Sequence, residues 1–165
     1  MSDDPFAELN PASPSLSSWQ KTRSLGEHEV PFVIEPSEAA PTKEDLAAVA
    51  CFWTDLASFD AKARTLLHEE TLEDDSTTRE YLEHYLEELP FEVLTELFGD
   101  AEDLEMLTFV ETLVLVRVAL SPGERFAVLD YSIRLDIADH VLAVSLTAEG
   151  DRWAIEIERC VRPGA

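Results

Sequence analysis

Apolar residues follow two different spacings along the chain. Over residues 43–111 they recur every three or four positions, which is the period of one buried face of an α-helix. From Leu113 onward they form continuous or alternating runs, which are typical of β-strands. The change of period near Leu113 predicts an α+β domain whose helices precede a sheet.

Capping residues and prolines divide the helical part into segments. A serine, threonine or aspartate before an apolar run is a typical helix start, and a proline is tolerated in the first turn. The expected starts are Thr42, with Asp45 at the third helical position, then Asp60, then Ser76 or Thr77, and finally Pro90, whose helix ends near Gly99. A last helix is expected over residues 101–111.

Four β-forming segments, separated by turn residues, follow the helices. They cover residues 113–120, 126–133, 141–147 and 153–158. They predict a four-stranded antiparallel meander at the C-terminus, with the helical N-terminal part packed on one face. Pro122 and Gly123 stand at the two central positions of an expected type II turn. A short strand is also expected over residues 30–35, where Pro31 indicates a sheet edge or a strand start.

The length of 165 residues predicts one domain, with a core that joins helices to strands. Residues 1–20 hold three prolines and five serines, which indicates a flexible N-terminal arm, and residues 21–165 form the single α+β domain. Arg117 interrupts an apolar strand, which predicts a cross-strand ion pair with Asp130 or Glu156. The expected core residues are Trp53, Tyr85, Leu94, Leu115, Leu129, Val144 and Ile155.

The excess of acidic over basic residues is concentrated in the helical part of the chain. The formal net charge is −23, and residues 44–105, with nineteen acidic and three basic residues, carry −16 of it. Binding of nucleic acid or of an anionic membrane is not expected, because both need a basic surface. The acidic residues form either a solvated face or a docking surface for a basic partner. The candidate partner-binding residues are Glu73, Asp74, Asp75, Glu80, Glu83, Glu87, Glu92 and Glu96.

Nothing in the sequence predicts export or a membrane span. The N-terminus is acidic, unlike a secretory signal, and the longest apolar runs fall far short of the ~20 residues of a spanning helix. Cys51 and Cys160 are too few for a disulfide framework and are interpreted as structural residues. A cytoplasmic location is therefore expected.

No residue pattern predicts a catalytic centre or a cofactor. The sequence contains no His-Glu-x-x-His, Cys-x-x-Cys or Gly-x-Ser-x-Gly motif and no glycine-rich phosphate loop. Neither an enzyme, a specific metal site nor a cofactor is expected, although weak binding of Ca²⁺ by the dense carboxylates stays open. Asp139 and His140, which are neighbours in sequence, are interpreted as loop residues without a catalytic role.

Three strand motifs stand out in the C-terminal third. They are Asp130-Tyr131, the run DHVLAV over residues 139–144, and IEIE over residues 155–158. This pattern resembles an uncharacterised bacterial α+β family whose sheet carries an Asp-Tyr strand followed by an Asp-x-x-Leu-x-Val strand. Members of that family are similar to immunity proteins of polymorphic toxin systems. The resemblance implies no catalytic residues, and it does not explain the N-terminal arm or the acidic helices.

The negative net charge, the absence of catalytic motifs and the resemblance to immunity proteins together predict an acidic cytoplasmic binding protein. The expected role is that of an immunity-type inhibitor that occludes a basic toxin domain, with a protein partner that has a basic surface. One alternative is an adaptor or structural interaction domain without a toxin partner. A second alternative is a small hydrolase that uses carboxylates of the helical part.

Overall fold

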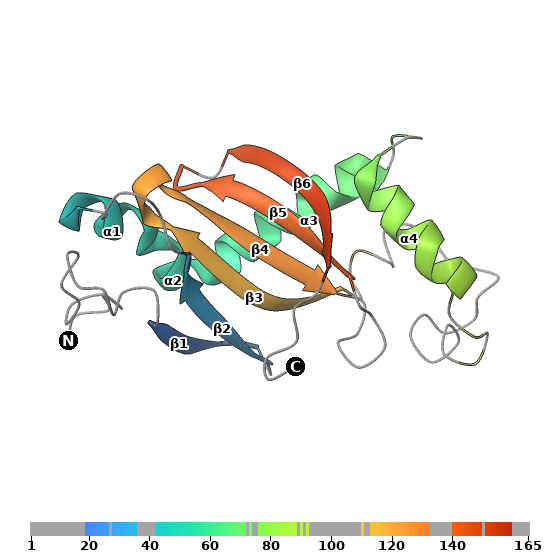
Figure 1. Ribbon diagram of the computed structural model, residues 1–165, viewed down its shortest axis with the longest axis horizontal. Helices are drawn as coiled ribbons and strands as arrows, with labels where there is room; N and C mark the ends of the chain where they lie inside the picture. Colours follow the sequence, from blue (N-terminus) through green and yellow to red (C-terminus); the bar gives the residue numbers. More distant parts are fainter. Residues whose placement is uncertain are drawn as a thin grey trace.

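A six-stranded mixed β-sheet forms the centre of the protein (Figure 1). The computed structural model describes residues 19–26, 28–35, 42–71, 73, 76–88, 90, 92, 110, 113–132, 140–149 and 151–159. The elements are β1 (Gln20–Leu25), β2 (His28–Ile34), α1 (Lys43–Val49), α2 (Cys51–Thr54), α3 (Leu56–Thr71), α4 (Thr77–Glu88), β3 (Val114–Ser121), the 3₁₀ helix η3 (Pro122–Glu124), β4 (Phe126–Ser132), β5 (His140–Thr147) and β6 (Arg152–Arg159). The strands lie in chain order across the sheet, from β1 at one edge to β6 at the other.

The α+β class is confirmed, but a four-stranded meander is an incomplete description of the sheet. Strands β3 to β6 do pair antiparallel in chain order. Strands β1 and β2 extend the same sheet, and β2 runs parallel to β3, with Phe32 opposite Val118. A parallel neighbour requires a long crossover, and the helical part of the chain supplies it.

The position expected for Pro31, at a sheet edge or a strand start, is wrong. Strand β2 begins at His28 and lies between β1 and β3. Pro31 stands opposite Thr22 of β1, and the pairing with β3 begins only at the next residue, Phe32. The missing N–H of the proline therefore lies just before the parallel ladder and does not interrupt it.

Strand β1 forms the edge of the sheet and was not expected from the sequence. It pairs antiparallel with β2 from Gln20 to Leu25, and Gly26 starts the turn of the hairpin with a φ of 61°. Residues 1–18 of the expected arm lie outside the described residues. Trp19 is buried and Gln20 already belongs to β1, so these two residues are part of the fold.

The first helix begins where the sequence indicates, and the second does not. Thr42 caps α1 with a capping box, in which its hydroxyl accepts from the Asp45 N–H and the Asp45 carboxylate accepts from the Thr42 N–H. Asp60 was expected to cap a helix, but it lies inside α3, which begins at Leu56. The helices expected after Pro90 and over residues 101–111 lie outside the described residues, apart from Pro90, Glu92 and Val110.

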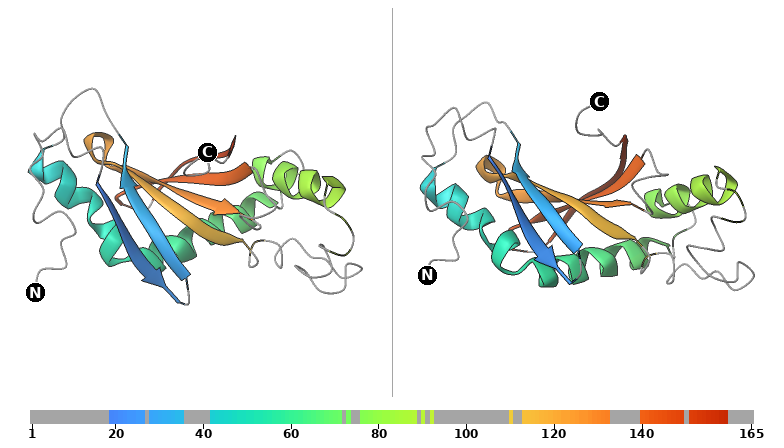
Figure 2. Two further views of the ribbon diagram at one scale, coloured as in Figure 1. Left: turned by 60° about the horizontal axis from the view of Figure 1, so that its bottom comes forward. Right: turned by 90° about the horizontal axis from the view of Figure 1, so that it is seen from below.

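The core lies between the sheet and the helices α1, α2 and α3, which cover one face (Figures 1 and 2). Helix α4 lies beyond one end of the sheet, at the opposite end of the molecule from α1 (Figure 1). Trp53 is only half-buried, because its ring stands at the margin of the core, edge-on to Phe32 at 5.1 Å. The side chains of Tyr85 and Leu94 lie outside the described residues. The expected core residues that the structure confirms are Leu115, Leu129, Val144 and Ile155.

The turn between β3 and β4 differs from the expected type II turn. Pro122 to Glu124 form a 3₁₀ helix, and the residue with positive φ is Arg125, at 56°, instead of Gly123. The Arg125 guanidinium reaches the Asp45 carboxylate at 3.0 Å and so joins this turn to the start of α1. The hydrogen bond from the Thr42 N–H, together with this contact to Arg125, lowers the pKa of Asp45.

The ion pair expected for Arg117 is present on the face of the sheet opposite the helices. Its guanidinium lies 3.1 Å from the carboxylate of Asp130 on the neighbouring strand and 3.6 Å from that of Glu35. The Asp130 side chain is buried, whereas the Arg117 side chain is partly exposed to solvent. The pair therefore neutralises a buried carboxylate in the middle of the sheet.

Candidate protein-binding surface on helix α4

Helix α4 is fixed to the rest of the fold at its first turn. The Ser76 hydroxyl accepts a hydrogen bond from the Arg79 N–H at 3.2 Å, which confirms the helix start expected at Ser76 or Thr77. Thr78 donates both its N–H and its hydroxyl to the buried Glu70 carboxylate of α3, at 2.9 and 3.1 Å. A carboxylate at a helix N-terminus also interacts favourably with the helix dipole. Glu70 therefore holds the two helices in a defined orientation.

A second contact fixes the middle of α4 to the sheet. Tyr81 is only 1% exposed, and its hydroxyl donates to the backbone oxygen of His140 at 2.9 Å. His140 is the first residue of β5, so α4 is attached to the end of the sheet nearest to it. With Thr78 and Tyr81 buried on one side, the helix presents its other side outward.

Helix α4 carries four exposed carboxylates, three of them on its outward side and Glu88 in its last turn. We call Glu80, Glu83, Glu87 and Glu88 the acidic surface. Arg79 is the one arginine or lysine of this helix, and its guanidinium lies 3.5 Å from the Glu83 carboxylate. One base among these carboxylates leaves the acidic surface strongly negative.

The structure brings together three of the eight candidate partner-binding residues. Glu80, Glu83 and Glu87 share the exposed side of α4, as their spacing indicated. Glu73 is exposed just after α3, and Glu92 is exposed beyond the end of α4. Asp74, Asp75 and Glu96 lie outside the described residues. Glu88 was not among the candidates, although it follows Glu87 directly and is exposed beside it.

A small pocket adjoins the acidic surface. It has a volume of about 160 Å³ and lies between α4 and the strands β5 and β6. The rings of His84 and His140 meet there edge to face, with their centres 6.0 Å apart. Glu80 and His84 are one helical turn apart in the sequence, whereas the approach of His140 to His84 depends on the tertiary fold. The lining residues are Glu80, Tyr81, His84, His140 and Ile157.

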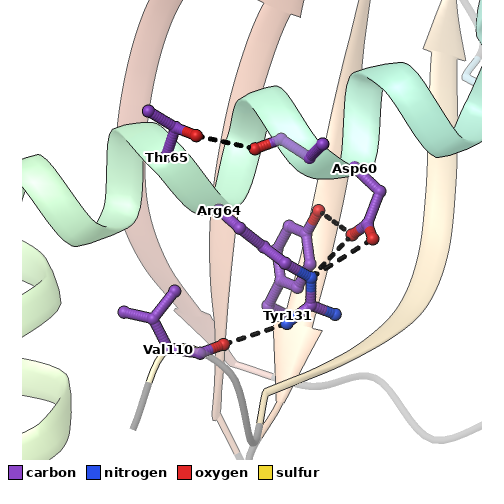
Figure 3. Close-up of polar contacts among 6 residues, drawn as sticks. Asp60, Arg64, Thr65, Val110 and Tyr131 are labelled. Carbon is purple, nitrogen blue, oxygen red and sulfur yellow. Dashed lines mark hydrogen bonds and ion pairs between the residues drawn. The ribbon is translucent and has the colours of Figure 1, made fainter. Parts of the chain in front are cut away.

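A second polar cluster lies between α3 and β4 and was not expected from the sequence. Figure 3 shows the Tyr131 hydroxyl pointing to the Asp60 carboxylate, to which it donates at 2.7 Å. Arg64 donates to both oxygens of the same carboxylate and also to the backbone oxygen of Val110, at 2.9 Å. Its guanidinium lies over the Tyr131 ring, 5.1 Å from the ring centre.

The contacts of this cluster indicate a structural role. Burial raises the pKa of Tyr131 well above its ordinary value, and the negative charge of Asp60 adds to the effect. The phenol therefore stays protonated and serves as a hydrogen-bond donor. The contacts of Arg64 and Tyr131 join α3, β4 and Val110 into one unit.

Cys51, Asp139 and Cys160 are the other candidate chemical groups of the sequence. Cys51 is half-buried, its thiol donates to the Ala48 oxygen at 3.1 Å, and burial raises the pKa of the thiol, which disfavours the reactive thiolate. Asp139 and Cys160 lie outside the described residues. Among the described residues no group of three His, Cys, Asp or Glu side chains is placed to hold a metal ion.

None of the helices in the described part of the chain is both long and apolar enough to span a membrane. Comparison of the chain with protein-family models, with curated proteins and with solved structures gives no match to any of them.

Proposed function

We propose that the protein is a binding protein that holds a basic protein partner against the acidic surface of α4. The observation that carries this proposal is a row of exposed carboxylates on a helix whose opposite side is attached to the fold. Carboxylates on a solvent-facing helix attract a basic partner over a distance and repel an acidic one.

The attachment of α4 supports a role in recognition as well as in solubility. A solubility coat needs only charge, whereas recognition benefits from charges held in fixed relative positions. Glu70 and Tyr81 fix the helix at two places, through the Thr78 and His140 contacts. The acidic surface is therefore presented in one orientation before any partner arrives.

Inhibition of a toxin domain is the form of this proposal that we favour. An inhibitor that protects a cell has to reach its target quickly, and electrostatic steering raises association rates by about 10- to 1,000-fold. An adaptor could use the same surface. Loss of the partner's activity on binding would indicate an inhibitor, and retained activity would indicate an adaptor.

The test begins with the full chain as bait in lysate of the source cells. Proteins captured at low salt and released at high salt are identified by mass spectrometry, and the basic ones are purified. Association and dissociation rates are then measured by biosensor for the wild type and for the double variant Glu83→Lys with Glu87→Lys. We expect the association rate of the variant to fall at least about tenfold, and its dissociation rate to change less.

A matched control separates the position of the charge from its amount. Glu124→Lys with Glu149→Lys reverses two exposed carboxylates in the turns at the α1 end of the molecule and changes the net charge equally. We expect this control to keep most of the association rate. Equal losses in the two double variants, or an association rate that neither salt nor charge reversal changes, would contradict the proposal.

A further inference from the structure

The pocket beside the acidic surface combines one carboxylate with ring faces and an aliphatic side chain. Glu80 supplies the negative charge, the two imidazoles and the Tyr81 ring supply flat surfaces, and Ile157 supplies an apolar contact. We propose that this pocket receives an arginine side chain of the basic partner, so that the inference rests on the proposed function and deepens it.

The chemistry of a guanidinium group matches this lining. A guanidinium is planar, always charged and weakly hydrated, and it stacks on aromatic and imidazole rings while it donates hydrogen bonds at its edge to a carboxylate. A lysine ammonium would find the same negative charge, but it has no flat face to place against the rings. Arginine is also among the residues that most often anchor protein interfaces from within a pocket.

The same lining argues against an anionic ligand. The Glu80 carboxylate repels an anionic ligand, and the other carboxylates of the acidic surface add to that repulsion. The Tyr81 hydroxyl donates to the His140 backbone oxygen, which keeps its ring in place as a wall of the pocket.

The geometry of α4 gives the pocket and the carboxylates outside it different tasks. Glu80 and His84 are one helical turn apart and both line the pocket, whereas Glu83 and Glu87 are not among the lining residues. Exposed carboxylates outside the pocket act mainly on the approach of the partner. A guanidinium held against the rings and Glu80 acts on how long the partner stays.

The test is an NMR titration of the full chain with three short peptides. They are identical except at one position, which holds arginine, lysine or citrulline, the last being an uncharged analogue of arginine with the same shape. The ring signals of His84 and His140 are followed. We expect the arginine peptide to shift both rings saturably, with at least about fivefold tighter binding than the lysine peptide, and the citrulline peptide to shift neither.

Two single variants of α4 locate the binding. Glu80→Gln removes the carboxylate of the pocket, and Glu87→Gln removes one equal charge from the exposed side of the same helix. We expect about tenfold weaker arginine binding for Glu80→Gln and less than about twofold for Glu87→Gln. The dispersed spectrum of each variant shows that it is folded.

Failure of this inference would differ from failure of the proposed function. If neither ring shifts with the arginine peptide, or if both variants weaken binding equally, the pocket does not receive arginine. The proposed function would still stand as long as charge reversal at Glu83 and Glu87 slows association with the captured partner. If that reversal has no effect but the rings shift with arginine, the pocket binds arginine without an acidic docking surface.

Discussion

Tyr131 shows how one buried side chain connects parts of the chain that are far apart in sequence. Its hydroxyl bonds to Asp60, 71 positions earlier, and the Arg64 guanidinium covers its ring on the way to Val110. A hydrogen bond to a charged acceptor contributes about 1.5–3 kcal/mol when it is shielded from water. Asp60 and Arg64 are partly exposed, so the lower part of that range applies here.

We expect Tyr131→Phe to lower the free energy of unfolding by about 1–2 kcal/mol, because Asp60 loses a buried donor. Thr65→Ala is the control, because the Thr65 hydroxyl donates to the backbone oxygen of Ala61 on the exposed side of the same helix. It should change stability by less than about 0.5 kcal/mol. Urea unfolding monitored by circular dichroism measures both. Equal effects of the two substitutions would show that the Tyr131 hydrogen bond adds nothing.

The raised pKa of Tyr131 also predicts how alkali affects the fold. The native state keeps this phenol protonated beyond the pH at which an unfolded tyrosine ionises. Its contribution to stability is therefore complete below the ordinary tyrosine pKa of about 10 and is lost as the pH rises from there toward the raised native value. Tyr131→Phe should show a smaller loss of stability over the same alkaline range. A loss as steep as that of the wild type would contradict this expectation.

Among the elements, the β1–β2 hairpin extends the sheet through contacts that its own sequence hardly indicates. Strand β1 reads QKTRSL and is largely exposed. Thr22 is its one β-branched residue, and the strand lacks the apolar alternation of a half-buried strand. Pairing with β2 and the turn at Gly26 hold it in place. The charged side chains of Lys21 and Arg23 also make this edge less suitable for pairing with another chain.

We expect Gly26→Ala to destabilise the protein by about 1–2 kcal/mol, because a residue with a Cβ rarely adopts the φ of 61° found there. No atom lies within 4 Å of the position that the new Cβ would occupy, so crowding adds nothing to this cost. Gly26→Asn should be milder, since asparagine tolerates the left-handed region better. Chemical unfolding of the two variants tests this. Equal stability of the alanine variant and the wild type would mean that the hairpin turn relaxes.

The elements also show which parts of the fold could be predicted from the sequence. The Thr42 cap, the strands after Leu113 and the Arg117–Asp130 pair follow from local spacing, and the structure contains all of them. Strand β1 could not be predicted because an exposed edge needs no apolar pattern. Asp60 was misjudged because the same residue type that caps helices also serves inside one as a partner for Arg64.

The candidate site was also only partly predictable from the sequence. The helical spacing of Glu80, Glu83 and Glu87 was enough to place them on one exposed side of α4. The pocket was not predictable, because it arises only where β5 starts beside α4 and brings His140 to His84. Long-range approaches of this kind leave no periodic signal in the sequence.

At the scale of the whole molecule, the net charge of −23 opposes the compact state. Raising sodium chloride from about 0.01 M to about 1 M shortens the screening length from about 30 Å to about 3 Å. We expect the melting temperature to rise, by about 2–4 °C for each kcal/mol of repulsion that is screened. The rise should be smaller for a variant with Glu83→Gln and Glu87→Gln. A fall with added salt would mean that screening of ion pairs such as Arg117–Asp130 outweighs the relief of repulsion.

During synthesis the β1–β2 hairpin leaves the ribosome long before β3 exists to pair with it. Phe32 pairs with Val118, 86 positions later, and closing a loop of that length costs about 4 kcal/mol of chain entropy. Until β3 is made, the β2 edge of the hairpin therefore lacks its parallel partner strand. The segment made in that interval is the one over residues 44–105, which carries −16. Like charges on neighbouring nascent chains repel one another, so the acidity that would steer a partner to the finished protein also protects the unfinished one from aggregation.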